Sequence, residues 1–209
     1  MNREHPVVLI EGQIGVGKTT LGEILQEEFS LPLYRELGNP HTLTLLDKFY
    51  ADKKRWSFTL QIHFLNERFR MIKEIFKNNG GILDRSIFGD RIFASMLHDS
   101  NEMTDEEFST YSTLLDNMLE HVQKPQLLIY LDCTTETALA RIQKRDRGLE
   151  SSISADYLDK LNKKYISWYN DYNLSPKLFV NANDLDIFDK SSKKQLLDKI
   201  SQYLAPVTT

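Results

Sequence analysis

The pattern G-x-x-x-x-G-K-[ST] occurs near the N-terminus, as Gly12-Gln13-Ile14-Gly15-Val16-Gly17-Lys18-Thr19. It follows an apolar run of strand length, Val7 to Glu11, and opens a helical pattern that extends to Phe29, which is the expected context of a phosphate-binding loop. Glycines permit a tight turn whose N–H groups point inward, and the helix N-terminus adds a positive dipole end. The alternative, a glycine-rich turn that matches by chance, does not explain this context.

The segment therefore predicts a nucleoside triphosphate site. We expect Lys18 to reach the β- and γ-phosphates and the hydroxyl of Thr19 to bind Mg²⁺. The residues expected to contact the triphosphate here are Gly12, Gln13, Ile14, Gly15, Val16, Gly17, Lys18, Thr19 and Thr20.

Apolar runs of strand length alternate with helical patterns along the rest of the chain. The predicted strands are Val7 to Glu11, Leu33 to Glu36, Gly81 to Asp84, Leu127 to Asp132 and Lys177 to Asn181. The predicted helices cover about residues 18–29, 41–51, 55–77, 90–97, 104–122, 135–144, 155–172 and 193–203. This alternation predicts one α/β domain, residues 1–209, with a five-stranded parallel sheet flanked by helices on both faces. Ligands of such sheets bind beyond the carboxyl ends of the strands.

Composition excludes several classes of protein. The 209 residues include 26 Lys and Arg against 30 Asp and Glu, so there is no basic excess to neutralise a nucleic-acid backbone. The single cysteine, Cys133, excludes an internal disulfide framework and fits a reducing compartment. No apolar run approaches the ~20 residues that span a bilayer, and the first residues do not read as a signal peptide. We expect a cytoplasmic protein that acts on a small molecule, without a nucleic-acid or membrane partner.

The predicted phosphate-binding loop alone does not indicate which reaction the protein carries out. A GTPase switch needs an Asn-Lys-x-Asp guanine reader and an Asp-x-x-Gly turn, and the chain contains neither. A motor with a large second domain does not fit within 209 residues. A small-molecule kinase needs two further features, which are mobile cations that shield the transferred phosphoryl group and side chains that position the acceptor.

Candidate cations follow the fourth predicted strand. Arg141, Arg145 and Arg147 end a helical pattern that runs into a polar stretch, and we interpret residues 144–154 as an Arg-rich lid that folds over phosphates. The alternative is a solvated helix end, where the helix dipole favours arginine in any protein. The phosphate loop makes the lid the better interpretation.

The long predicted helix has two stripes of different character. The apolar stripe, expected to face the core, consists of Phe58, Ile62, Leu65, Phe69, Ile72 and Phe76. The second stripe consists of Gln61, Phe64, Arg68 and Met71. Its amide, guanidinium and aromatic groups suit a planar nucleobase, and the alternative is an exposed polar face of an amphipathic helix.

Carboxylates end two of the short predicted strands, at Glu36 and Asp84. A carboxylate near an acceptor hydroxyl can take its proton during phosphoryl transfer, and an aspartate beside the phosphate loop can hold Mg²⁺. Spacing does not decide whether Asp84 or Asp132, at the end of the fourth predicted strand, serves the metal.

Taken together, the motifs resemble the deoxyribonucleoside kinase family over nearly the whole chain, from Glu11 to Tyr169. They are the loop Glu-Gly-x-Ile-Gly-x-Gly-Lys-Thr, Arg55-Trp56-Ser57-Phe58 with Gln61, Asp84-Arg85-Ser86, Asp90-Arg91-Ile92-Phe93-Ala94, the arginines of Arg141 to Arg147, Tyr157-Leu158, Leu161 and Trp168. The Gln61-x-x-Phe64 pattern with Asp84-Arg85-Ser86 is most similar to bacterial deoxyadenosine/deoxycytidine kinases.

The resemblance implies roles for individual residues. Glu36 would be the base for the nucleoside 5′-hydroxyl, Arg85 would hold that carboxylate and the reacting phosphate, and Asp84 would serve Mg²⁺. The expected catalytic residues are Lys18, Glu36 and Arg85, and the expected metal ligands are Thr19 and Asp84. The expected acceptor-binding residues, from the second stripe and the resemblance together, are Glu36, Tyr50, Trp56, Gln61, Phe64, Arg68, Arg85, Asp90, Phe93 and Glu150.

Among the acceptor-binding residues, the resemblance assigns Gln61, Arg68 and Asp90 to the base and Tyr50 and Glu150 to the sugar 3′-hydroxyl. It makes Trp56 and Phe93 walls of the base pocket. The lid cations that it implies for the bound nucleotide are Arg141, Arg145 and Arg147. It also implies a homodimer.

The sequence thus predicts a P-loop kinase that uses ATP and Mg²⁺ to phosphorylate the 5′-hydroxyl of a deoxyribonucleoside. Deoxyadenosine and deoxycytidine are favoured because their bases share a donor–acceptor edge, and deoxyguanosine stays open as an acceptor. Two alternatives also stay open. A nucleoside monophosphate kinase of the thymidylate kinase type would need a further cation group for the acceptor's own phosphate. A nucleoside triphosphate sensor without turnover would not need the lid arginines or Glu36.

Overall fold

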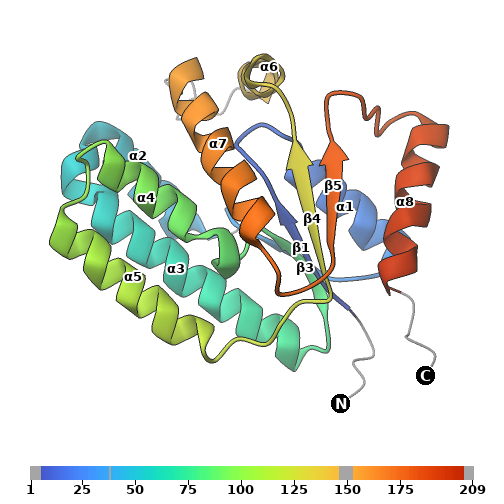
Figure 1. Cartoon of the computed structure of the whole chain (residues 1–209), viewed down its shortest axis with the longest axis horizontal. Coiled ribbons are helices and arrows are strands. Elements are labelled where there is room, and N and C mark those ends of the chain that lie inside the picture. Colours follow the sequence, from blue (N-terminus) through green and yellow to red (C-terminus); the bar gives the residue numbers. More distant parts are fainter. Residues whose placement is uncertain (1–5, 38, 146–152, 205–209) are drawn as a thin grey trace.

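A computed structural model of the chain describes residues 6–37, 39–145 and 153–204. Five parallel strands form a sheet in the order β2-β3-β1-β4-β5 (Figure 1). The strands are β1 (Val7–Glu11), β2 (Leu33–Arg35), β3 (Gly81–Asp84), β4 (Leu127–Asp132) and β5 (Lys177–Asn181). The predicted parallel α/β sheet is confirmed. Strand β2 ends one residue earlier than predicted because Glu36 already belongs to the turn that follows.

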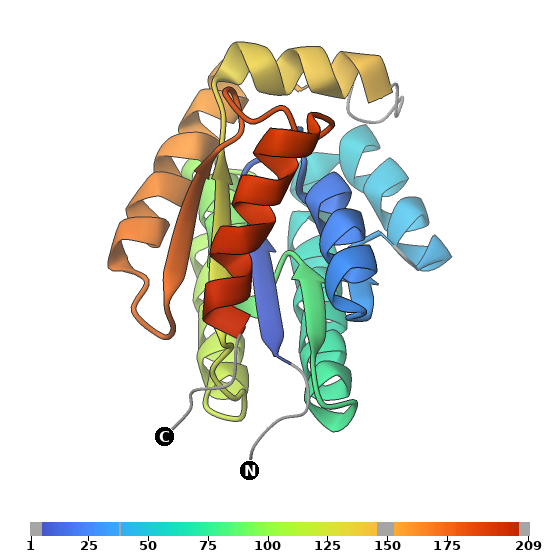
Figure 2. The same ribbon diagram turned by 90° about the vertical axis from the view of Figure 1, so that its right-hand side faces the viewer.

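Helices cover both faces of this sheet, as predicted. They are α1 (Lys18–Phe29), α2 (Pro40–Ala51), α3 (Lys53–Lys77), the 3₁₀ turn η1 (Ile87–Gly89), α4 (Arg91–Asp99), α5 (Asp105–Leu119), α6 (Thr135–Arg145), α7 (Ala155–Asp171) and α8 (Lys190–Leu204). Helices α1 and α8 lie on one side of the sheet, and α3, α4, α5 and α7 lie on the other (Figure 1). Helix α6 lies across the carboxyl ends of the strands (Figure 2). Within the described residues, no helix is both long enough and apolar enough to cross a membrane.

Alternate residues of the central strands enter two different cores, because successive side chains of a strand point to opposite faces of the sheet. In β1, Val8 and Ile10 pack in the core formed with α1, α6 and α8, whereas Val7 and Leu9 pack in the core formed with α3, α4 and α5. Apolar residues therefore fill both faces of the sheet. A ligand site must consequently lie at the ends of the strands rather than on either face.

Helix α3 buries both of its stripes. In the predicted apolar stripe, Leu65 and Ile72 are buried, and the phenylalanines beside them are half-buried. The second stripe, which consists of Gln61, Phe64, Arg68 and Met71, is buried as well. The alternative of an exposed polar face is therefore excluded. Because buried polar groups need partners, the amide and the guanidinium of this stripe mark a candidate site.

Strand register brings three carboxylates to one edge of the sheet. Asp84 at the end of β3 is level with Ile10 of β1 and with Arg35 of β2. Glu11 is the last residue of β1, and Glu36 directly follows β2. Both therefore emerge beside Asp84 at the carboxyl edge, where the phosphate loop also begins.

Helix α5 begins with a capping box. The hydroxyl of Thr104 accepts a hydrogen bond from the backbone N–H of Glu107 at 3.2 Å, and the carboxylate of Glu107 accepts one from the N–H of Thr104 at 3.0 Å. Thr104→Ala leaves an N–H of the first turn without its partner. We expect the free energy of unfolding to fall by about 1 kcal/mol, measured by urea denaturation.

Thr113→Ala is the matched control for this prediction. Thr113 is exposed later in the same helix, and its hydroxyl donates to the carbonyl of Ser109 at 3.0 Å. Alanine has the higher helix propensity at such a position, so we expect no loss of stability. Equal losses in the two variants would contradict the capping argument.

Candidate active site

The backbone of the phosphate loop adopts conformations that exclude side chains at two glycines. Gly12 has φ of 142°, and a Cβ atom there would lie 2.3 Å from the carbonyl oxygen of Leu131. Gly15 has φ of 80°, and its Cβ would lie 2.6 Å from the carbonyl oxygen of Ala138. The loop thus packs directly against the end of β4 and against α6. Its glycines are required by conformation and by space.

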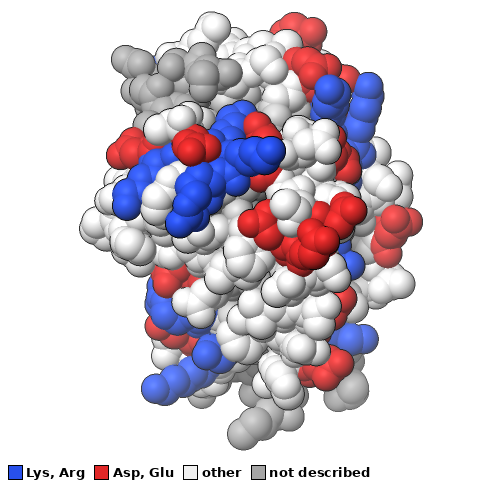
Figure 3. Space-filling model, turned by 90° about the vertical axis from the view of Figure 1, so that its left-hand side faces the viewer, with Lys and Arg blue, Asp and Glu red and all other residues white. Residues whose placement is uncertain are grey.

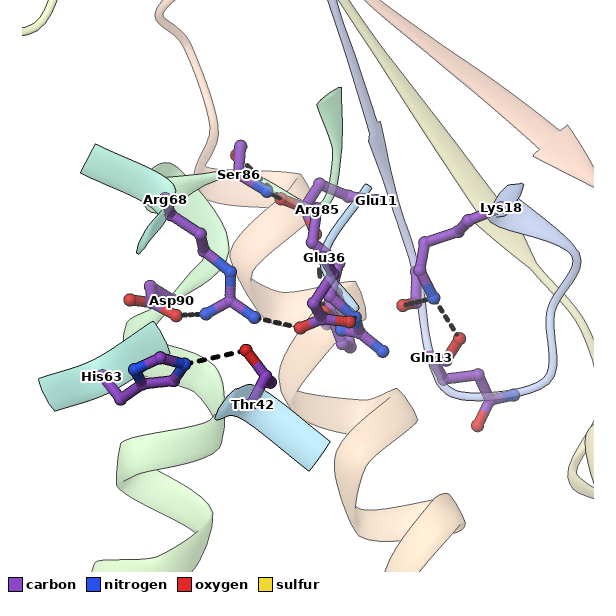
Figure 4. Close-up of polar contacts among 12 residues, drawn as sticks. Glu11, Gln13, Lys18, Glu36, Thr42, His63, Arg68, Arg85, Ser86 and Asp90 are labelled. Atoms are coloured by element: carbon purple, nitrogen blue, oxygen red, sulfur yellow. Dashed lines mark hydrogen bonds and ion pairs between the residues drawn. The ribbon is translucent and has the colours of Figure 1, made fainter. Parts of the chain in front are cut away.

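Lys18 folds back over its own loop (Figure 4). Its ammonium donates to the carbonyl oxygens of Gly12 at 3.0 Å and Gln13 at 2.8 Å. Burial and the nearby charge of Arg85 lower the pKa of Lys18 to about 7. An anion placed against the loop would favour the charged ammonium, which is the arrangement expected of a phosphate site.

The other loop residues face in different directions. The amide of Gln13 donates to the carbonyl oxygen of Cys133 at 2.8 Å, so its side chain is engaged with β4 and its neighbourhood. Ile14 is half-buried and packs against the apolar cores. The residues from Gly15 to Thr20 line a cavity of about 680 Å³. The side chains of Gln13 and Ile14 are therefore engaged elsewhere, and only their backbone groups are available for the predicted contacts with a triphosphate.

Thr19 and Asp84 form a candidate metal site. The hydroxyl of Thr19, in the first turn of α1, donates to Oδ2 of Asp84 at 2.6 Å. A hydroxyl and a carboxylate oxygen are ligand types that Mg²⁺ accepts, and Mg²⁺ commonly takes its other ligands from substrate phosphates and water. This donor set therefore fits the metal. Of the two aspartates that spacing left open, Asp84 is the one bonded to Thr19.

Glu36 lies between two arginines (Figure 4). Nε of Arg85 lies 2.9 Å from Oε2 of Glu36, and Nη2 of Arg68 donates to Oε1. Burial by itself raises the pKa of Glu36, but the charges of Arg85 and Arg68 outweigh it and lower that pKa below its ordinary value. The carboxylate is therefore ionised at neutral pH. It can accept a proton from a hydroxyl group as that hydroxyl becomes more acidic during a reaction.

Arg85 is held in an unusual conformation. Its φ is 70°, in the left-handed region that side chains other than glycine seldom adopt, and its N–H donates to the carbonyl oxygen of Ile10 at 3.1 Å. The guanidinium lies 4.6 Å from the ring centroid of Phe93 and donates to the hydroxyl of Tyr165. Backbone strain of this kind is often found where a side chain must be placed for function.

The second stripe of α3 reaches Glu36 through Arg68. Arg68 is 3 % exposed and forms an ion pair with Asp90, which is 1 % exposed, while its guanidinium lies 5.0 Å from the ring centroid of Phe64. Gln61 is 4 % exposed, and its Oε1 has no hydrogen-bond partner among the described residues. A buried amide oxygen without a partner is costly unless a ligand or water completes it.

Trp56, near the start of α3, packs with Leu45, Leu60 and Phe64. Lys48 and Arg55 lie over its ring, at 4.6 Å and 4.9 Å from the centroid. On the face formed by α2, α4 and α5, Lys and Arg side chains gather in a group with Asp and Glu side chains beside them (Figure 3). The indole itself is half-buried, with two cations over its ring.

The predicted sugar contacts are only partly described. Tyr50 is half-buried at the end of α2, and its ring makes an edge contact with Phe49. Burial raises the pKa of Tyr157, at the start of α7, and the proximity of Tyr50 adds to that rise. Tyr50 therefore faces the start of α7. Glu150 and Arg147, with most of the predicted lid, lie outside the described residues.

Part of the wall of the 680 Å³ cavity beside the phosphate loop is a segment that was not predicted from the sequence to belong to the site. Residues 182–188, which connect β5 to α8, line it together with Arg141, Lys144 and Arg145 of α6. Arg141 donates to the carbonyl oxygens of Val16 at 2.9 Å and Ala182 at 2.8 Å, so it joins the loop to this segment. The rule that ligands lie beyond strand ends would have indicated the segment, because it follows the carboxyl end of β5.

The site therefore has two parts. One is the cavity lined by the phosphate loop, α6 and residues 182–188. The other is the group of side chains around Glu36, to which Arg68, Arg85 and Asp90 belong. An anion on the loop and a polar, planar molecule beside α3 would meet at an ionised carboxylate flanked by cations. Such an arrangement suits transfer of a phosphoryl group to a hydroxyl.

Comparison with known proteins agrees with this geometry. The family model described as deoxynucleoside kinase matches residues 8–205. The chain is 35% identical to the deoxyadenosine kinase of Lactobacillus acidophilus, over 96% of this chain and 97% of the relative. It is 36% identical to the deoxyadenosine/deoxycytidine kinase of Bacillus subtilis, over 96% and 94% of the two chains. The deoxyguanosine kinase of Lactobacillus johnsonii is 35% identical over 93% of this chain and 90% of its own.

A solved structure shares the fold over almost the whole chain. The deoxyadenosine kinase of M. mycoides with bound dATP superposes with a TM-score of 0.80 at 30% identity and covers 93% of this chain and 98% of its own. The structure of that enzyme with dCMP and dCDP gives a TM-score of 0.82 at 29% identity, with the same coverage. The predicted resemblance is confirmed, and the chain belongs to the deoxynucleoside kinase family.

Proposed function

We propose that this deoxynucleoside kinase transfers the γ-phosphoryl group of ATP to the 5′-hydroxyl of deoxyadenosine or deoxycytidine, with deoxyguanosine as a further acceptor. The observation that carries the proposal is the ionised carboxylate of Glu36, held by Arg68 and Arg85 between the nucleotide cavity and the second stripe of α3. A carboxylate there can orient a primary alcohol and take its proton as the new P–O bond forms.

The phosphate end of the reaction depends on Lys18 and Arg85. Lys18 exchanges its bonds to the loop carbonyls for bonds to phosphate oxygens, and the anion keeps the ammonium charged. Arg85 faces the transferred group with a guanidinium that is already fixed, so little reorganisation is needed in the transition state. The lid cations Arg141, Arg145 and Arg147 add positive charge around the phosphates.

Thr19 and Asp84 would hold Mg²⁺. The metal, when bound, neutralises charge on the phosphates and orients them. The support for this assignment is the hydrogen bond at the carboxyl edge of β3, where the hydroxyl oxygen of Thr19 lies 2.6 Å from Oδ2 of Asp84.

The base end of the reaction depends on Gln61, Arg68 and Asp90. The amide of Gln61 can accept from an exocyclic amino group through its partnerless Oε1 and donate to a ring nitrogen. Adenine and cytosine both present that pair of groups, which is why both are proposed. Phe64, Trp56 and Phe93 supply apolar walls, while Tyr50 and Glu150 contact the sugar 3′-hydroxyl.

We further propose that residues 1–209 form a single catalytic domain with a lid at about 144–154, and that the protein works as a homodimer in the cytoplasm. Support for the dimer comes from the family resemblance alone. Light scattering after gel filtration tests it, and a monomer at working concentration would contradict it.

A side-by-side assay of deoxyadenosine, deoxycytidine, deoxyguanosine and thymidine, together with their monophosphates, tests the activity. We expect the highest kcat/KM with deoxyadenosine or deoxycytidine and ATP. Turnover of monophosphates alone would indicate a nucleoside monophosphate kinase, and nucleotide binding without turnover of any acceptor would indicate a sensor. Either result would refute the proposal.

Glu36→Gln is expected to lower kcat by roughly 10²- to 10⁴-fold, because a positioned base is lost. Dissociation constants for the deoxynucleoside should change little, since the amide keeps the shape of the side chain. Steady-state kinetics and equilibrium titration measure the two effects. Glu74→Gln is the control, because Glu74 pairs with Arg70 on the exposed side of α3. A normal kcat in Glu36→Gln would assign the base elsewhere.

Gln61→Ala is expected to raise the KM for the deoxynucleoside by about tenfold or more, because a buried amide that reads the base is lost. The KM for ATP should stay within about twofold, since no part of Gln61 faces the nucleotide cavity in the proposal. Initial-rate kinetics with each substrate varied in turn measure both values. An equal rise in the two KM values would argue against base reading by Gln61.

Binding of ATP at pH 8 is expected to take up about one proton, because free Lys18 is largely neutral above its pKa of about 7 and the phosphates restore its charge. Protons are taken up rather than released, because the bound anion raises the pKa of the lysine in the complex. Calorimetry in buffers of different ionisation enthalpy measures the uptake. Lys18→Arg is the control, since a guanidinium is always charged, and it should take up no proton. Equal uptake in the two proteins would contradict the assignment to Lys18.

A further inference from the structure

Two buried polar side chains beside the site have no part in the chemistry proposed above. Glu11 is the last residue of β1, and Tyr165 lies in α7. Each is 1 % exposed. The hydroxyl of Tyr165 accepts from Nη1 of Arg85 and donates to Oε2 of Glu11 at 3.4 Å. Burying a carboxylate and a phenol destabilises the folded protein unless both groups form hydrogen bonds. The role of the hydrogen bonds that these two side chains form therefore needs an explanation.

Glu11 holds the turn that carries Arg85. Its Oε1 accepts from the backbone N–H and from the hydroxyl of Ser86, both at 2.7 Å. A Cβ atom on Gly89 would lie 3.1 Å from the same carboxylate, so the turn closes tightly around Glu11. Ser86 directly follows Arg85, whose φ of 70° is unfavourable for a side chain. The two bonds from Ser86 thus fix the turn in the conformation that Arg85 requires.

Tyr165 holds the other end of Arg85. The guanidinium is contacted on three sides, with its Nε on Glu36 at 2.9 Å, its Nη1 on the hydroxyl of Tyr165 and its face 4.6 Å from the ring centroid of Phe93. An arginine side chain has many rotamers, and the contact with Tyr165 adds a second fixed point to the one at Glu36. One hydrogen-bonded chain therefore runs from Glu11 through Tyr165 and Arg85 to Glu36.

We infer that Glu11 and Tyr165 are positioning residues for Arg85. Glu11 fixes the turn after β3 and the Tyr165 hydroxyl, and that hydroxyl fixes the guanidinium against Glu36. The inference rests on the proposed roles of Arg85 and Glu36. It makes Arg85 preorganised before either substrate binds, which is the condition under which a cation stabilises a transition state most effectively.

The experiment measures Tyr165→Phe in the wild-type protein and in an Arg85→Lys background, with ATP and the best deoxynucleoside. In the wild-type protein we expect kcat to fall about tenfold, while both KM values stay within about twofold. In the Arg85→Lys background we expect less than about a twofold further fall, because the positioned group is already lost. Glu11→Gln, which keeps the shape of the side chain, should follow the same pattern in both backgrounds.

Tyr130→Phe is the matched control. Tyr130 is fully buried in β4, its ring lies 6.2 Å from that of Tyr165, and its hydroxyl donates to Asn162 at 3.3 Å. It loses a buried hydroxyl in the same aromatic cluster without losing a contact to Arg85. We expect its kcat to stay within about twofold of the wild type. Thermal unfolding of all variants verifies that each is folded at the assay temperature.

The outcomes separate the inference from the proposed function. A wild-type kcat in both Tyr165→Phe and Glu11→Gln would overturn the inference. Equal losses of kcat in the two backgrounds, or an equal loss in Tyr130→Phe, would also overturn it, because the effect would then be structural. A wild-type kcat in Arg85→Lys itself would instead refute the proposed role of Arg85. If Tyr165→Phe fails to fold, Glu11→Gln in the two backgrounds decides the matter alone.

Discussion

The ion pairs of Glu36 with Arg68 and Arg85 are the constraint on which the rest of the site depends. Removing a carboxylate from water costs several kcal/mol unless cations and hydrogen bonds replace the solvent. Here the two arginines come from different elements, α3 and the turn after β3, and Glu36 itself comes from the turn after β2. The charge balance therefore requires these three elements to meet. The parallel sheet achieves this by ending β2 and β3 at the same level.

The same electrostatics divides the pocket into two parts of different character. Arg141, Lys144 and Arg145 line the cavity beside the phosphate loop together with Asp184 and Asp186, and burial next to Arg85 lowers the pKa of Lys18 to about 7. Beside α3, the guanidinium of Arg68 is instead paired with Glu36 and with Asp90. An anion at the loop would restore the charge of Lys18, while the guanidinium beside α3 is already neutralised by carboxylates. The proposed placement of the phosphate donor at the loop and of the neutral acceptor beside α3 agrees with this difference in charge.

Local patterns predicted most of the fold, because they depend on neighbours in the chain. The loop context fixed β1 and α1, and apolar runs located the central strands. Spacing could not choose between Asp84 and Asp132, since strand order and register are properties of the assembled sheet. The burial of Arg68 could not be predicted from the sequence either, because it depends on how α3 packs against the other helices. Tyr165 was missed because an aromatic residue at helical spacing reads as ordinary core.

The two parts of the site rest on different kinds of structure, with consequences for how the enzyme can evolve. Gln61 and Arg68, the proposed readers of the acceptor base, share α3 with Leu65 and Ile72 of the core, so their substitution disturbs a helix that also supports the fold. Residues 182–188 form a connection in which Phe188 is 84% exposed. Loops tolerate substitution more readily than packed helices. With the donor and acceptor placed as proposed, preference for the phosphate donor is therefore free to drift between lineages, whereas a new acceptor specificity demands compensating changes in the core.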